Sequence, residues 1–141
     1  MDELQELRKQ IEARDYDAAI AIVNELEEMS REDKINKIFS FSLILWQHLI
    51  KREAEGRTTN SWEASIKEAA TQIQRINTRR RVGSTYLSDE GLHENLKEAL
   101  PLALAKAAAE AFGGALDVPT LEAKVNQSSL LDAALQTIST T

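Results

Sequence analysis

Two histidines, a short basic loop and a run of arginines are the groups in this chain whose chemistry could serve a site. His48 lies in an apolar stretch and His93 lies far from it, with no His-x-x-x-His spacing, so we expect no metal site. His48 is a weak candidate for a general base, because that role needs a cleft and a partner. The alternative is a structural histidine with a satisfied hydrogen bond. The sequence favours a protein without enzymatic activity or cofactor.

The basic loop precedes an expected helix, and its composition favours an anion site. The first backbone N–H groups of a helix have no partner within the helix, and its dipole attracts negative charge. The candidate ligands of an anion are Lys51, Arg57, Thr59, Asn60, Ser61 and Trp62. The alternative is purely structural: Asn60 caps the helix in a box with Glu63, Trp62 packs on Trp46 or Leu49, and Arg57 pairs with a glutamate.

Weak candidates for nucleic-acid contact are Arg75, Arg79, Arg80 and Arg81. Tyr86 is the only aromatic residue near them, which gives little support for base stacking. The charge is unevenly spread: residues 30–82 carry 11 basic and 6 acidic groups, whereas the whole chain has a net charge of −6. The alternative is a solvated basic loop that the acidic ends of the chain neutralise.

The longest expected element, residues 30–56, must position these groups. Ser30 and Asp33 can form a capping box, and Gly56 can end the helix in a left-handed conformation. Its centre, residues 38–50, is apolar on almost every side, and such a helix is buried all round. We therefore expect a central rod that other helices cover.

Apolar spacing predicts further helices on both sides of this rod. They cover residues 2–14, 15–29, 60–76, 88–112 and 128–138. Asp15 or Asp17 can cap the helix over 15–29, Ser88 the helix over 88–112, and a weak box starting at Ser129 the last helix. Pro101 predicts a kink or break in the helix over 88–112, and Pro119 predicts extended chain over residues 117–119. No alternating pattern typical of a strand is present.

These elements predict an all-α fold, a bundle of five or six helices around a long central apolar helix. We expect a single domain over residues 1–141, with a core at about 2–138 and flexible last residues. The longest apolar stretch is too short and too often interrupted to cross a membrane. The acidic, amphipathic start is unlike a secretory signal, and the absence of cysteine fits a reducing compartment. We therefore expect a cytoplasmic protein.

Several of these features resemble a bacterial family called Domain of Unknown Function family 29. The similar features are an acidic helix, a long apolar helix with His48 and Lys51 near its end, Arg57 in a loop, and Ser61-Trp62 followed by Ile66. The resemblance spans about residues 17–113 and implies an all-helical bundle in a cytoplasmic protein. It implies no activity and no catalytic residues. The chain departs from the family pattern where Gly56 and Asn60 replace a proline and further arginines.

Two functions remain open at this point. The favoured one is a non-enzymatic helical module that binds another protein or a second copy of itself, since few helices are available to cover an apolar rod. The alternative is a binder of an anionic ligand or nucleic acid through the basic segment 51–81. An exposed apolar patch would favour the first function, and an uncovered positive face would favour the second.

Overall fold

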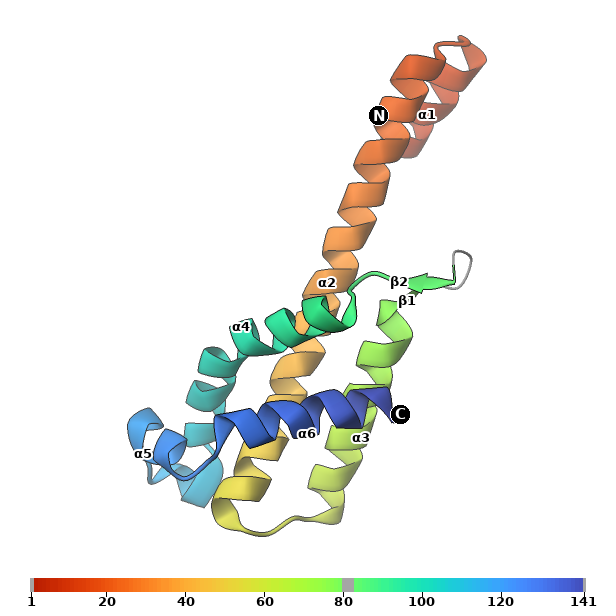
Figure 1. The fold of residues 1–141 in the computed structure, drawn as a ribbon. Helices are drawn as coiled ribbons and strands as arrows, with labels where there is room; N and C mark the ends of the chain where they lie inside the picture. Colours follow the sequence, from red (N-terminus) through yellow and green to blue (C-terminus); the bar gives the residue numbers. More distant parts are fainter. Residues whose placement is uncertain (1, 80–82, 141) are drawn as a thin grey trace. The chain divides into compact units, whose positions relative to one another are not determined.

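The computed structural model describes residues 2–79 and 83–140, which form an all-α fold (Figure 1). The elements are α1 (Glu3–Glu12), α2 (Tyr16–Glu55), α3 (Asn60–Asn77), β1 (Thr78–Arg79), β2 (Ser84–Thr85), α4 (Asp89–Ala108), the 3-10 helix η1 (Ala111–Gly114), α5 (Val118–Ala123) and α6 (Gln127–Ser139). The predicted fold class is confirmed. The chain divides into two compact units, Met1–Lys34 and Ile35–Thr141, which are described separately. The expectation of a single domain stays a prediction.

The first unit is a helical hairpin made by α1 and the start of α2. The Asp2 side chain accepts a hydrogen bond from the Gln5 N–H at 2.8 Å and so caps α1. Arg14 turns the chain with a positive φ of 61°. The Asp15 carboxylate then accepts from the Ala18 N–H at 3.2 Å, as expected for the cap of the next helix.

The predicted helix start at Ser30 is wrong, because α2 is one helix of 40 residues that runs through this position. The residues around Ser30 include no Gly or Pro, and most of them are good helix formers. A serine and an aspartate cap a helix only where the backbone leaves the helical conformation, and here it does not. The predicted end is confirmed, since Gly56 follows α2 with a φ of 64°.

The second unit has its core around the C-terminal half of α2. Buried side chains from α2, α3, α4, α5 and α6 form one cluster. Trp46 is fully buried, and its indole N–H donates to the Leu96 carbonyl at 2.8 Å. The rod is not buried all round, because Ile44 is 39% exposed. Since this chain's own helices cover most of the apolar centre, burial of the rod gives no reason to expect a second copy.

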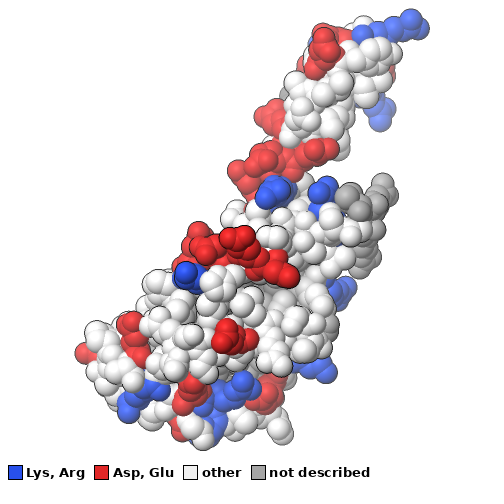
Figure 2. Space-filling model, in the orientation of Figure 1, with Lys and Arg blue, Asp and Glu red and all other residues white. Residues whose placement is uncertain are grey.

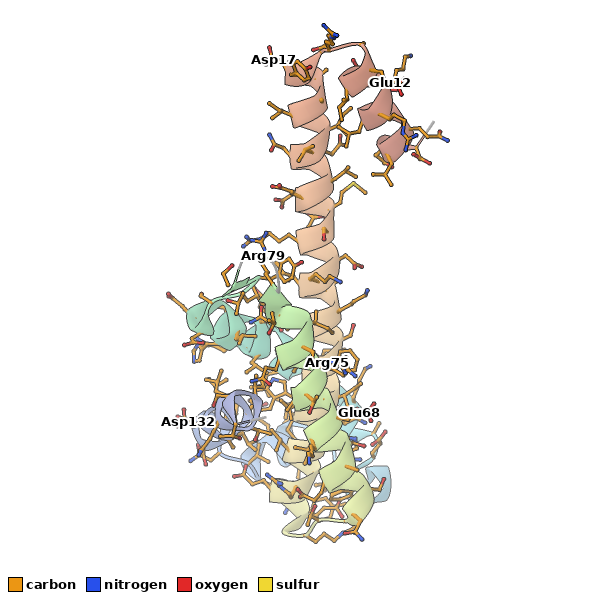
Figure 3. All side chains as sticks on the ribbon, turned by 90° about the vertical axis from the view of Figure 1, so that its right-hand side faces the viewer. Glu12, Asp17, Glu68, Arg75, Arg79 and Asp132 are labelled. Carbon is orange, nitrogen blue, oxygen red and sulfur yellow. The ribbon has the colours of Figure 1, made fainter. Side chains whose placement is uncertain are left out.

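The other helices of this unit pack around that core. As the short loop predicts, α3 runs back alongside α2 in the opposite direction (Figures 1 and 3), and it also packs against α6. The Ser88 hydroxyl caps α4, as expected, by accepting from the Gly91 N–H at 3.1 Å. The alanine-rich part of α4, including Ala103 and Ala107, lies in the core.

A two-stranded hairpin between α3 and α4 corrects the prediction that no strand is present. Thr78 pairs with Thr85, and Arg79 pairs with Ser84, in antiparallel register. Each strand has only two residues, too few to show an alternating pattern. The Asn77 side chain stabilises this β-hairpin, because it accepts a hydrogen bond from the Leu87 N–H at 2.7 Å and donates one to the Leu87 carbonyl at 3.0 Å.

The two proline predictions have different outcomes. Helix α4 continues through Pro101, so of the predicted kink or break the break is absent, and the ribbon of α4 changes direction along its length (Figure 1). Asp117 is extended as predicted, but Val118 and Pro119 already belong to α5, because Asp117 caps this helix by accepting from the Thr120 N–H at 2.9 Å. Pro119 then falls in the first helical turn, where a missing N–H costs nothing.

The last helix begins earlier than predicted. The Asn126 side chain accepts from the Ser129 N–H at 3.0 Å, so Asn126 is the cap in place of the box predicted at Ser129. The helix continues to Ser139. The flexibility expected for the last residues stays a prediction.

Candidate functional site

The predicted anion site lies where α2 ends and α3 begins, and the structure brings its main residues together. The Lys51 ammonium lies 4.9 Å from the centre of the Trp62 ring, and the Arg57 guanidinium lies 4.7 Å from it. Lys51 is buried, whereas Arg57 is exposed and Trp62 is half-buried. Cations over an indole ring gain from its negative face. The cluster Lys51–Arg57–Trp62, called the tryptophan cluster below, therefore concentrates positive charge on one aromatic side chain.

Carboxylates of the same chain already neutralise the cations of the tryptophan cluster. Lys51 Nζ lies 2.8 Å from Glu110 Oε2, and Arg57 Nε lies 3.2 Å from Glu55 Oε1. The hydrogen bond from Lys51 lowers the pKa of Glu110 below its usual value of 4.5. An incoming anion would have to compete with both carboxylates for these cations.

The cap of α3 differs from the prediction. The Thr59 hydroxyl accepts from the Trp62 N–H at 3.0 Å, so Thr59 is the cap, and Asn60 is the first helical residue with an exposed side chain. Because Thr59 already satisfies the Trp62 N–H, one of the donors proposed for an anion is occupied. Ser61 follows in the same turn and is exposed.

Glu63 does not complete a capping box with Asn60. Its Oε1 atom accepts from the Thr58 hydroxyl at 2.7 Å and from Arg52 Nη1 at 2.9 Å. Both hydrogen bonds lower the pKa of Glu63 below its usual value of 4.5, and the bond from Thr58 has the larger effect. The start of α3 is thus held to the end of α2 through side chains on both helices.

His48 lies close to this cluster, and its surroundings disfavour the protonated form of its imidazole. Its Nδ1 atom is buried without a hydrogen-bond partner, in contrast to the satisfied histidine that the structural alternative assumes. Burial, followed by the nearby Lys51 charge, lowers the pKa of His48 below 6.5, while Glu110 opposes this shift. Within the described part of the chain, no group of three potential metal ligands is arranged around a common point.

The basic candidates for nucleic-acid contact are only partly placed. Arg75 lies towards the C-terminal end of α3, and Arg79 lies in β1 (Figure 3). The Arg79 guanidinium lies 5.3 Å from the centre of the ring of Tyr86, the one aromatic residue that the sequence places near the basic candidates. Arg80 and Arg81 lie outside the described residues.

A groove between α4, α5 and α6 was not predicted. It encloses about 520 Å³, and it is lined by Trp46, His93, Lys97, Leu100, Pro101, Leu104, Val118, Glu122, Gln127, Ser128 and Leu131. Its walls are largely apolar, and its polar residues include one lysine and one glutamate. The charges in this groove therefore do not indicate which class of ligand it would bind. Sequence reasoning missed it because it depends on the capped start of α5 and on how three helices pack.

The first unit has a surface that sequence reasoning also missed. Six large apolar side chains of the α1–α2 hairpin are exposed: Leu4, Ile11, Tyr16, Ile20, Val23 and Met29. Three of them, Tyr16, Ile20 and Val23, follow at intervals of four and three on one side of α2 and are called the hairpin surface below. Leu4 is 69% exposed and Ile20 is 57% exposed. Among the described residues of this unit, Ala19 is the one buried side chain. The sequence predicted the two helices of this unit but not which of their apolar side chains remain exposed.

Comparison with known proteins gives a family but no activity. A family model described as "Domain of unknown function DUF29" matches residues 2–134. No curated protein and no solved structure matches the chain. Among the described residues, no helix is long and apolar enough to cross a membrane. Because the match covers nearly the whole chain, this protein belongs to the DUF29 family, and the predicted resemblance is confirmed.

Proposed function

We propose that this DUF29 protein is a non-enzymatic helical module that binds another protein through the hairpin surface. The observation that carries the proposal is the concentration of exposed apolar side chains in residues 2–34. Of the nine large apolar residues that are exposed among those described, six lie in this unit; the other three are Ile44, Leu102 and Phe112. Three of these six share one side of α2 as the hairpin surface, and an exposed apolar patch of this kind is typical of interaction sites.

The hairpin also has little core of its own. Helix α1 has 10 residues, and Ala19 is the one buried side chain among the described residues of this unit. Full burial of a side chain such as Leu4 or Ile20 contributes about 1.5–3 kcal/mol. A partner that covers several of these side chains would therefore both bind the hairpin and stabilise it.

The test is capture of partners from a bacterial lysate with matched variants of the full chain. Ile20→Ser combined with Val23→Ser removes exposed apolar groups without changing the charge. Leu102→Ser is the control, because Leu102 is 46% exposed but lies in α4 of the second unit. We expect the wild type and Leu102→Ser to retain the same protein and the double variant to lose it. Equal retention by all three would contradict the proposal.

We retain anion or nucleic-acid binding as the alternative function, supported by the two cations that lie over Trp62. Its residues are Lys51, Arg57, Thr59, Asn60, Ser61 and Trp62, with Arg75 and Arg79 as further contacts. Titration with inorganic phosphate, followed by Trp fluorescence, tests it. The alternative expects binding that Arg57→Gln weakens, while an unchanged spectrum in the wild type would reject it.

We further infer a cytoplasmic, bacterial setting for this function. The absence of cysteine fits a reducing compartment, and the family resemblance implies bacteria. Fractionation of the bacterial source with an antibody against the chain tests this placement.

A further inference from the structure

We infer that the hairpin surface takes a positively charged amphipathic helix and not a second copy of this chain. This inference rests on the proposed function and adds the chemistry of the partner. It follows from two features of the first unit: the charge that surrounds the exposed apolar residues, and the spacing of those residues along α2.

The charge of the first unit is strongly negative. Residues 1–34 carry 11 acidic and 5 basic side chains, a net charge of −6. Figure 2 shows acidic side chains along this segment on the face in view, and Figure 3 shows Glu12 and Asp17 at the turn between α1 and α2. A positive partner would gain attraction over the whole hairpin, and complementary charge both speeds association and rejects wrong partners.

The exposed residues of α2 have the spacing of a helix-binding stripe. Tyr16, Ile20 and Val23 follow each other at intervals of four and three, so they lie on one side of the helix. Glu27 continues the stripe four residues later, and Asp17 is next to its start. Apolar stripes of this spacing pack against a helix, and the charges beside them select its partner. Lysine or arginine beside the partner's own apolar stripe would match these carboxylates.

A second copy fits this surface poorly. Two hairpins packed into a four-helix bundle would bring two net charges of −6 together in one small volume. Like charges placed opposite each other across an interface oppose association. The apolar residues alone would allow a homodimer, but the charge pattern favours a partner of opposite sign.

The test uses two synthetic helical peptides of about 20 residues, long enough for a stable amphipathic helix. One combines a leucine stripe with lysines, and the other combines the same stripe with glutamates. Each is labelled and titrated with the full chain, and binding is followed by fluorescence anisotropy. We expect the lysine peptide to bind and the glutamate peptide to remain free. Ile20→Ser with Val23→Ser should weaken binding at least about tenfold, equal to 1.4 kcal/mol.

A second variant separates charge from apolar contact. Asp17→Asn with Glu27→Gln keeps the apolar stripe and removes two negative charges. We expect it to bind the lysine peptide more weakly and with a smaller loss of affinity as salt rises, because fewer charge pairs are screened. Circular dichroism of each variant confirms that the helices are retained.

Three results would overturn the inference, and they differ in what they say of the proposed function. Equal binding of both peptides, lost in Ile20→Ser with Val23→Ser, would reject the positive partner and leave the hairpin surface as the binding site. A homodimer that this double variant dissociates would replace the partner by a second copy. Binding of the lysine peptide that no hairpin variant changes would reject both the inference and the proposed function.

Discussion

At the scale of single residues, His48 links the packing of α2 to pH. Its folded-state pKa is lowered by burial and by the nearby Lys51. The unfolded chain therefore binds a proton at His48 more readily than the folded chain, so stability decreases as pH falls below about 6.5. The pKa of Glu110 is also lowered, so the protein loses further stability as the pH falls below about 4.5 and this carboxylate becomes protonated.

We therefore predict that His48→Gln makes stability less dependent on pH between about 7.5 and 5.5, because no buried imidazole remains to be protonated. Urea unfolding at several pH values measures this dependence. Wild-type stability that stays constant over this range, or a variant with the same slope as the wild type, would contradict the assignment.

The tryptophan cluster shows how far single residues can be predicted from the sequence. Lys51, Arg57 and Trp62 lie together as expected, because a short loop joins the two helices that carry them. Glu110, which pairs with Lys51, is 59 residues away and could not be assigned before the fold was known. The same holds for the indole of Trp46, which donates to a carbonyl of another helix.

At the scale of elements, the start of α3 has two neighbouring candidates for the helix cap, Thr59 and Asn60. We predict that Thr59→Ala lowers the free energy of unfolding by about 1 kcal/mol, because the Trp62 N–H loses its acceptor. Asn60→Ala is the matched control and should cost much less, since its side chain is exposed and is not the cap. Thermal unfolding of both variants decides the assignment, and a larger loss in Asn60→Ala would show that it is wrong.

The predicted and missed elements differ in what determines them. Apolar spacing predicted the helices α3 and α6, whose buried residues include Ile73 and Ala134. Local capping motifs were less reliable. Ser30, a predicted cap, lies inside α2, whereas Asp117, predicted to lie in extended chain, caps α5. Whether such a motif caps a helix depends on where the backbone turns. That is decided by packing of the whole chain.

At the scale of the whole molecule, the two units differ in how much of their apolar surface is buried. The second unit has an extensive core and contains the tryptophan cluster and the groove. The first unit has one buried side chain among its described residues and a net charge of −6. The sequence predicted helices in both units, yet it could not show that the apolar stripe of the first would remain exposed.

The central claim is that the hairpin surface is where a partner binds, and hydrogen exchange with mass spectrometry tests it most directly. The full chain is measured alone and with the lysine peptide. Because the hairpin has little core, its amides should exchange fast in the free chain. With the peptide, we predict slower exchange throughout residues 3–34 and little change in residues 35–140. Slower exchange confined to residues 35–140 would contradict the claim.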